Sequence, residues 1–406
     1  MSLELKVNDI KRGKPLRKFN NSLLQDKEYA KLVKDTILKV KQQYSFPQEG
    51  EMSFTRDTHH AGYQINDQLF FEMILLEIRG KTISYAAYKK KQARQKENEL
   101  RSEIKKLEDH HTINENDLVL LEAKKEELRL LRQQNIEGMI VRSKIKWIQE
   151  GERPSKYFCH LEKRNFVQKH LSFIQKEDGE VLFDQDEIVK ETKDFYEKLY
   201  ESRVKDVVDV DLHTMVEAPT LSSEEKESLE GLISEEEALA VLKRMNNQKS
   251  PGSDGFTTEF YMFFWKDIGH LLVRSINYGF RSGEMSITQK EGIITCIPKE
   301  GKPKQFLRNW RPITLLNTSY KITSSCIAAR IKTVLPKIIH NDQKGFMKGR
   351  YIGENLRLLY DVLVYTNFYK KLGLLLAVDF EKAFDRVAWS FIKKSLHRFN
   401  FGPDIK

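Results

Sequence analysis

The sequence contains no long hydrophobic run. Its apolar stretches, such as Phe260–Trp265 and Leu374–Val378, are far shorter than the roughly 18 residues that a membrane-spanning helix needs, so we expect no membrane partner. Residues 1–6 are too charged for the apolar core of a secretory signal. Cysteine is scarce as well: the three cysteines are an odd number and lie far apart, which argues against a disulfide framework. These absences predict an intracellular protein, without choosing between nucleus and cytoplasm.

With 20 glycines and 10 prolines in 406 residues, the chain is also poor in the residues that mark collagen-like or low-complexity sequences. It is rich in charge: 32% of the residues are charged, 40% are hydrophobic, and the mean hydropathy is −0.56. This balance predicts long solvated helices around a modest core. The length predicts about two to four structural units, at roughly 100–200 residues per domain.

The positive charge is concentrated near the C-terminus. Residues 289–406 carry 22 lysines and arginines against 9 aspartates and glutamates, a net charge of +13, whereas the whole chain carries +10. A basic block within an ordered region is a candidate surface for a polyanion such as nucleic acid. A solvated face with spare lysines has the same composition, so charge alone leaves both interpretations open.

Helical patterns dominate the first part of the chain. Asp26 is the predicted N-cap of an amphipathic helix over 26–42, and a second helix covers 65–78 and ends at Gly80. Between 83 and 146, apolar residues recur at heptad spacing on both sides of a polar turn. We expect an antiparallel helical hairpin there, with a dimeric coiled coil as the alternative.

The middle of the chain mixes strand and helix patterns. An Asp-Gly pair flanked by apolar residues predicts a β-hairpin within 171–181, and a helix follows over about 186–199. The polar tract 201–220 predicts a linker. Two capping boxes then open consecutive helices: Ser222 with Glu225, and Ser234 with Glu237.

Two turn-rich motifs follow. Residues 249–256, Lys-Ser-Pro-Gly-Ser-Asp-Gly-Phe, precede an aromatic run, and the simplest interpretation is a turn that leads into a buried aromatic helix. Further on, an apolar strand ends at Lys299, and Arg311 stands on the adjoining strand. These two cations can converge on phosphates, with arginine as a bidentate fork and lysine as a point charge. An exposed hairpin without a ligand explains the same spacing.

Two further motifs lie nearer the C-terminus. Residues 343–350 contain Gly345 and Gly349, which let a backbone approach a ligand closely, although a basic surface loop has the same composition. Leu374–Val378 is typical of a short buried strand, and it runs into Asp379 and a helix. Ligand sites favour the carboxyl ends of such strands. Asp379 is therefore either a helix N-cap or a ligand of Mg²⁺, which prefers carboxylates, waters and phosphates.

Taken together and in this order, the motifs resemble the reverse transcriptase of non-LTR, LINE-type retrotransposons. The segments that carry the resemblance are Lys249–Phe256, Ile297–Lys299, Asn309–Ile313, Gln343–Phe346 and Asp379–Asp385. Upstream, residues 146–158 are similar to the linker before that polymerase, and residues 17–24 to the end of the endonuclease in such proteins.

The resemblance implies an α+β fold in four parts. Residues 1–20 would be a remnant of the last endonuclease strand, and 21–146 a helical linker with the coiled-coil-like hairpin. A mixed connector, 147–220, leads to 221–406, a partial reverse transcriptase domain. That domain would hold the fingers and the first palm strand of a right-hand polymerase.

The resemblance also implies a role for each matching residue. Asp379 would be catalytic and bind Mg²⁺, the expected cofactor, and Phe380 would add its backbone carbonyl to the metal. Lys299 and Arg311 would grip the triphosphate, and Phe384 would be the bulky gate that rejects a ribose 2′-hydroxyl. The template-contacting and dNTP-pocket residues would be Gln343, Gly345, Phe346 and Arg350. The partners would be an RNA template and a DNA primer.

The sequence departs from the family pattern in one respect that concerns catalysis. The family has an aromatic-x-Asp-Asp hairpin downstream of its first aspartate, whereas these 406 residues contain no Asp-Asp dipeptide. We therefore expect a fragment truncated at both ends, which resembles an RNA-directed DNA polymerase but does not polymerise alone. The alternatives are a non-catalytic, basic nucleic-acid-binding protein and a coiled-coil assembly protein. The oligomeric state is not determined by the sequence.

Overall fold

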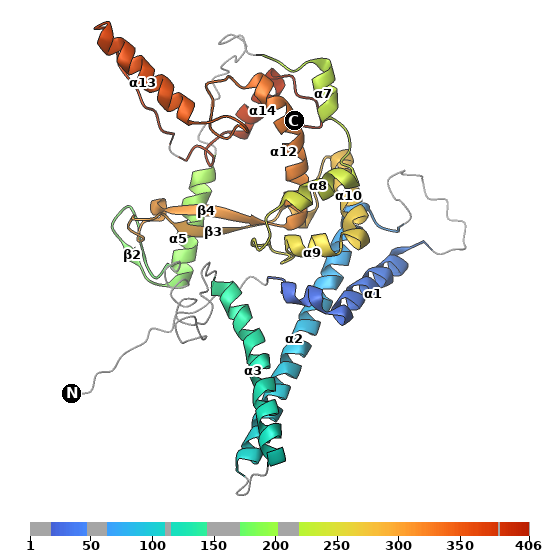
Figure 1. The fold of residues 1–406 in the computed structure, drawn as a ribbon. Helices are drawn as coiled ribbons and strands as arrows, with labels where there is room; N and C mark the ends of the chain where they lie inside the picture. The colour runs from blue at the N-terminus through green and yellow to red at the C-terminus, as the bar shows by residue number, and fades with distance from the viewer. Residues whose placement is uncertain are drawn as a thin grey trace, which may run out of the picture.

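The computed structural model describes residues 18–46, 63–109, 115–143, 171–201, 219–380 and 382–405. Over these residues the chain is mostly helical, with two small antiparallel sheets of two strands each, so the α+β class is confirmed (Figure 1). In chain order the elements are η1 (Asn21–Gln25), α1 (Lys27–Tyr44), α2 (Asp67–Glu108), α3 (Glu115–Ser143), β1 (Ile174–Gln175), β2 (Val181–Leu182), α5 (Gln185–Tyr200), α7 (Ser223–Leu229), α8 (Glu235–Arg244), α9 (Thr258–Phe263), α10 (Trp265–Ser282), α11 (Ile287–Lys290), β3 (Gly292–Pro298), η2 (Leu307–Asn309), β4 (Trp310–Leu316), α12 (Thr318–Ile338), α13 (Gly353–Phe368) and α14 (Trp389–Arg398).

The largest hydrophobic core joins segments that are far apart in sequence. It is formed by α1 and the first half of α2 on one side, and by α8, α9, α10 and α12 on the other. The apolar stripe predicted for α1 faces this core, and Tyr29 is completely buried. Asp26 is the N-cap as predicted, because its carboxylate accepts hydrogen bonds from the backbone N–H groups of Glu28 and Tyr29 at 3.0 and 3.4 Å. The N-terminal helices are thus packed directly onto the later part of the chain.

The prediction that the second helix ends at Gly80 is wrong, because α2 continues without interruption to Glu108. A single glycine inside a helix costs only about 1 kcal/mol relative to alanine. The packing of α2 against α1, α10 and α3 outweighs that cost. Gly80 itself faces open space, since a Cβ built on it would meet no atom within 4 Å.

The predicted helical hairpin is confirmed, and it lies within one chain. The second half of α2 and the first part of α3 extend away from the rest of the molecule and meet near the turn that joins them (Figure 1), and a small cluster of their leucines and an isoleucine is buried between them. Four ion pairs join the two helices: Lys96–Glu127 at 2.7 Å, Lys124–Glu103 at 2.8 Å, Lys125–Glu108 at 2.6 Å and Arg132–Glu97 at 3.5 Å. The seam that a coiled-coil dimer would use is therefore already occupied by the hairpin.

The β-hairpin predicted within 171–181 is confirmed as β1 and β2, with Gly179 at a φ of +96° in the turn. The helix predicted next is α5. The predicted linker 201–220 lies largely outside the described residues, as do the proposed endonuclease remnant and the segment 146–158.

The two predicted capping boxes differ in the structure. The first is complete, because Ser222 and Glu225 exchange both hydrogen bonds. In the second, Ser234 accepts from the backbone N–H of Glu237 at 3.1 Å, but the carboxylate of Glu237 does not return to the cap. It binds Arg330 on α12 instead.

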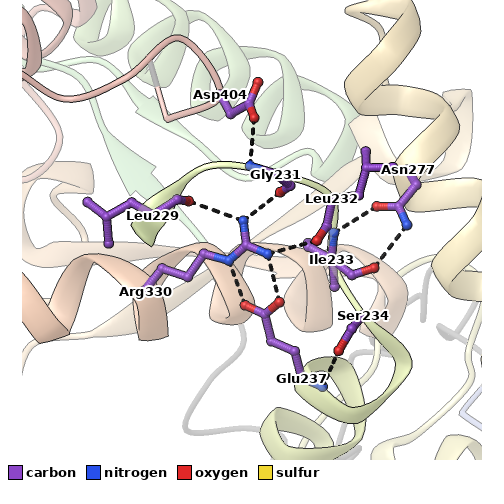
Figure 2. Close-up of polar contacts among 9 residues, drawn as sticks. All are labelled: Leu229, Gly231, Leu232, Ile233, Ser234, Glu237, Asn277, Arg330 and Asp404. Atoms are coloured by element: carbon purple, nitrogen blue, oxygen red, sulfur yellow. Dashed lines mark hydrogen bonds and ion pairs between the residues drawn. The ribbon is translucent and has the colours of Figure 1, made fainter. Parts of the chain in front are cut away.

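Arg330 ties the α7–α8 connection to α12 through five hydrogen bonds (Figure 2). Its guanidinium donates to both carboxylate oxygens of Glu237 at 2.8 Å, and also to the backbone carbonyls of Leu229, Gly231 and Leu232 at 2.7–3.2 Å. The carbonyls at the end of α7 are thereby satisfied by a side chain from a distant helix. Because its carboxylate is bound to Arg330, Glu237 does not complete the predicted capping box with Ser234.

The predicted strand at Leu374–Val378 is not formed, which corrects the expected first palm strand. Residues 371–380 have no regular secondary structure, and Leu374, Leu376 and Val378 are exposed. An extended apolar segment becomes a strand only when a neighbouring strand pairs with its backbone, and no such neighbour lies beside it in the described part of the chain. The helix expected to start at Asp379 begins later, as α14 at Trp389.

Candidate functional site

The first motif forms a structural turn, as its simplest interpretation predicted. Asn317, at the start of α12, is buried, and its Oδ1 accepts from the backbone N–H of Asp254 at 3.1 Å. Gly252 packs so tightly against Asn317 that an added Cβ would lie 2.1 Å from that Oδ1. Lys321 adds a hydrogen bond from its Nζ to the carbonyl of Ser250 at 3.0 Å. The aromatic run that follows is buried in the main core.

The second motif is the antiparallel hairpin β3–β4, which places Lys299 and Arg311 on one face. Ile297 pairs with Arg311 in the register, and the N–H of Lys299 donates to the carbonyl of Asn309 at 2.8 Å. Since side chains alternate between faces, Lys299 and Arg311 are diagonal neighbours on the same face. Arg311 is exposed, whereas Lys299 is half-buried and its Nζ donates to the carbonyl of Arg308 at 3.0 Å. The backbones of Lys299 and Arg311 therefore direct both side chains to one face of the hairpin.

The opposite face of this hairpin packs on α5, a helix to which sequence reasoning assigned no role. The thiol of Cys296 donates to the hydroxyl of Tyr196 at 3.6 Å, and Tyr196 is only 4% exposed. Burial raises the pKa of Tyr196 well above its usual range, and burial also raises the pKa of Cys296. Both groups stay protonated near neutral pH, so this contact is a neutral packing contact.

The fourth motif also contacts α5. The Nζ of Lys382 lies 5.0 Å from the centre of the Phe195 ring. Burial raises the pKa of Tyr200, and the nearby carboxylate of Asp385 raises it further. The last turns of α5 thus support both the β3–β4 hairpin and the segment after Asp379. The only sequence signal for this role was the aromatic cluster on an amphipathic helix.

The third and fourth motifs meet through two aromatic rings. The rings of Phe346 and Phe384 are 5.8 Å apart between centroids, at an interplanar angle of 84°. Both side chains are exposed, Phe346 to 94% and Phe384 to 84%. Phe346 also has a φ of +63°, a left-handed conformation that is uncommon for a bulky residue. A strained backbone therefore presents one of the two rings to solvent.

Arg350 has a local role in the third motif. Its guanidinium donates to the carbonyls of Ile339, His340 and Gln343 at 2.6–3.0 Å, and more weakly to that of Pro336 at 3.4 Å. These carbonyls belong to the last turn of α12 and the loop after it, so Arg350 caps the helix and folds the loop back onto it.

Gln343 and Gly345 form a small turn inside this loop. The Nε2 of Gln343 donates to the carbonyl of Gly345 at 3.1 Å. Gln343 is exposed, as is the neighbouring ring of Phe346. The side chains that surround the loop therefore position it with Phe346 facing solvent.

Asp379 and Phe380 lie in the irregular segment and are exposed. Among the residues that the structure describes, no three histidine, cysteine or acidic side chains come together to hold a metal. Asp379 on its own offers one carboxylate, which does not make a two-metal site. The expected Mg²⁺ site is therefore incomplete in the described part of the chain.

No helix within the described ranges is both long and apolar enough to cross a membrane.

Known proteins provide an independent comparison. Residues 297–405 match the family described as reverse transcriptase (RNA-dependent DNA polymerase). The chain is 32% identical over 394 residues to the transposon TX1 uncharacterized 149 kDa protein of Xenopus laevis, a match that covers 95% of this chain and 28% of that protein. It is 29% identical over 153 residues to the probable RNA-directed DNA polymerase from transposon X-element of Drosophila melanogaster, covering 37% of this chain and 17% of the relative.

A third relative, the probable RNA-directed DNA polymerase from transposon BS of Drosophila melanogaster, is 26% identical over 156 residues, with 37% of this chain and 17% of the relative covered. The chain thus spans less than a third of the length of each relative. The family match contains the Lys299–Arg311 face, the Phe346–Phe384 contact and Asp379. Residues 297–405 therefore match the reverse transcriptase family, and the chain is similar to transposon proteins that include probable RNA-directed DNA polymerases.

Proposed function

We propose that this chain supplies the nucleotide-gripping part of an RNA-directed DNA polymerase that copies an RNA template onto a DNA primer. The observation that carries the proposal is the contact between Phe346 and Phe384, which brings the third and fourth motifs together. The shared face of Lys299 and Arg311 supports it, because one surface then carries a point charge and a bidentate fork for phosphates. In this proposal residues 221–406 hold the fingers and part of the palm.

Each site residue has a specific task in the proposed polymerase. Lys299 and Arg311 bind the triphosphate of the incoming dNTP. Phe384 is the gate against a 2′-hydroxyl, and the loop around Phe346, with Gln343 and Gly345, contacts the template and the dNTP. Asp379 contributes a carboxylate and Phe380 a carbonyl toward Mg²⁺. Arg350 is a positioning residue, since its donors are bound to backbone carbonyls.

We further propose that these 406 residues do not polymerise by themselves. Activation of a primer hydroxyl and neutralisation of the leaving pyrophosphate require two metal ions held between several carboxylates. Asp379 is a single exposed carboxylate, and the sequence holds no Asp-Asp pair. Primer extension on an RNA template with Mg²⁺ should therefore give no product. Extension by the wild type that disappears in Asp379→Ala would show this part of the proposal to be wrong.

Measurements of nucleotide binding test the other part of the proposal, that this chain binds a dNTP. Titration calorimetry with dTTP in Mg²⁺ should show binding that weakens about 10- to 150-fold in Arg311→Ala, as expected for a lost charge-assisted hydrogen bond. Lys302→Ala, at the exposed tip of the same hairpin, is the matched control and should bind as the wild type does. Equal losses in Arg311→Ala and Lys302→Ala would mean that the hairpin attracts anions only through its net charge.

The basic C-terminal block favours a second candidate, a non-catalytic nucleic-acid-binding protein. With a net charge of +13 over residues 289–406, such binding would depend on phosphate contacts and fall steeply with salt. The two candidates differ in dTTP binding, which only the polymerase proposal requires. RNA binding that does not change between low and high salt would count against the second candidate.

A further inference from the structure

A cavity of about 330 Å³ lies where α2 crosses residues 18–23 and the 254–256 turn. This volume falls within the roughly 300–1,000 Å³ typical of ligand pockets. Phe19 and Phe256 line it with their ring centroids 6.3 Å apart, and the N–H of Phe19 donates to the carbonyl of Gly255 at 2.9 Å. Ile83 and Ala87 on α2 form an apolar wall. None of the residues assigned to the proposed dNTP site lines this cavity.

Three cationic residues line the apolar cavity: Lys18, Arg79 and Lys90. Lys90 follows Arg79 by eleven residues, which is about three turns, so both stand on one face of α2. Arg94, one further turn along, continues this face away from the cavity and is exposed. The positive charge therefore extends along the helix over more than the width of the cavity, which suits a polyanion better than a single small anion.

One carboxylate also lines the cavity. Asp254 lines the cavity, and its Oδ1 already accepts from the backbone N–H of Phe256 at 3.0 Å, which fixes the carboxylate in place. The positive charge of Arg79 acts on this carboxylate. An ionised carboxylate only accepts hydrogen bonds, so it suits the amino group of adenine, cytosine or guanine. Uracil has no amino group and therefore offers this carboxylate fewer donors.

We propose that this cavity binds one unstacked nucleotide of a single-stranded nucleic acid. The base enters the apolar cavity with its amino group toward Asp254, and the flanking phosphates lie on Lys18, Arg79 and Lys90. The strand then continues along α2 past Arg94. Base burial with backbone contacts to cations is how proteins hold single strands. This inference does not rest on the proposed polymerase function, because it uses other residues and needs neither a metal ion nor a dNTP.

Fluorescence anisotropy with the full chain and a fluorescein-labelled oligoadenylate RNA of about twelve nucleotides tests the proposal. Ala87→Trp fills the cavity without changing charge and should weaken binding roughly tenfold or more at an unchanged salt slope. Lys90→Glu should weaken binding and reduce the slope of log affinity against log salt by about 0.7 or more. Lys81→Glu is the matched control: it is exposed on the same helix, nine residues before Lys90 and therefore on the opposite side.

The expected result is a loss in Ala87→Trp and Lys90→Glu but not in Lys81→Glu, with circular dichroism melting curves that match the wild type. Wild-type affinity in Ala87→Trp, or an equal loss in Lys81→Glu, would overturn the site. If Ala87→Trp does not fold, the comparison of Lys90→Glu with Lys81→Glu decides.

Two further probes identify the bound strand. Oligouridylate should bind more weakly than oligoadenylate, and Asp254→Asn should narrow that difference; equal binding of both RNAs to the wild type would overturn the contact with Asp254. Oligodeoxyadenylate tests whether the bound nucleotide belongs to RNA or to DNA. Weaker binding of the DNA would assign the site to RNA through a 2′-hydroxyl contact, and equal binding would assign it to either strand.

Discussion

Phe346 and Phe384 meet edge to face with 5.8 Å between their ring centroids, although 37 residues separate them in the sequence. The two rings belong to the third and fourth motifs, for which we propose a shared role in dNTP binding. Because both rings are largely exposed, their contact contributes little to folding. They remain accessible to a ligand.

The first prediction separates a binding role of Phe384 from a structural one. Phe384→Ala should change the free energy of unfolding by less than about 0.5 kcal/mol, since the ring is exposed. The same change should weaken dTTP binding in Mg²⁺, because the ring is proposed to contact the sugar. Urea unfolding and titration calorimetry measure the two effects. Trp389→Ala, another exposed aromatic, is the control and should affect neither quantity.

The second prediction concerns Arg330. Its side chain is 16% exposed, and Arg330→Met would leave Glu237 and three backbone carbonyls without their donor. We expect the free energy of unfolding to fall by about 3 kcal/mol. Arg357→Met removes an exposed pair with Asp361 on α13 and should cost under about 0.5 kcal/mol. Similar losses from both changes in urea unfolding would contradict the importance of the Arg330 network.

The third prediction compares two glycines. Gly252→Ala should destabilise the protein by about 1–3 kcal/mol, because the new Cβ would overlap Asn317 and the backbone of Leu316. Gly80→Ala should instead stabilise it by up to about 1 kcal/mol, since Gly80 is inside α2 and a Cβ there meets nothing. Thermal unfolding of the two variants should therefore move the midpoint in opposite directions.

The fourth prediction is a pH dependence at Asp254. Burial raises the pKa of Asp254 from 3.8 to about 6, against the lowering effects of the Phe256 amide, Arg79 and Lys321. The folded protein therefore binds a proton that the unfolded chain releases between pH 4 and 6, so this carboxyl lowers stability as the pH rises through that window.

Asp254→Asn keeps an oxygen for the Phe256 amide but cannot ionise. Relative to wild type it should gain stability between pH 4 and 7, by about 3 kcal/mol at most. Thermal unfolding of both proteins at several pH values measures the difference. A difference that stays constant from pH 4 to 7 would show that the pKa of Asp254 is not raised.

Features set by local chemistry could be predicted from the sequence. Asp26 caps α1 because a carboxylate before an amphipathic run satisfies free N–H groups, whatever lies elsewhere. The Asp-Gly turn of the β1–β2 hairpin and the heptad spacing of α2 and α3 are local in the same sense. The order of the motifs also identified the reverse transcriptase family, because that order is itself a property of the sequence.

Only the tertiary structure decided which distant groups meet. Glu237 leaves its predicted capping box because Arg330 approaches from α12, and α5 supports two motifs through aromatic contacts that its own pattern does not specify. Leu374–Val378 has the composition of a strand, yet a strand exists only where another backbone pairs with it. An amphipathic or apolar pattern predicts that a segment favours burial. It does not specify which other segment buries it, because the hydrophobic effect is not directional.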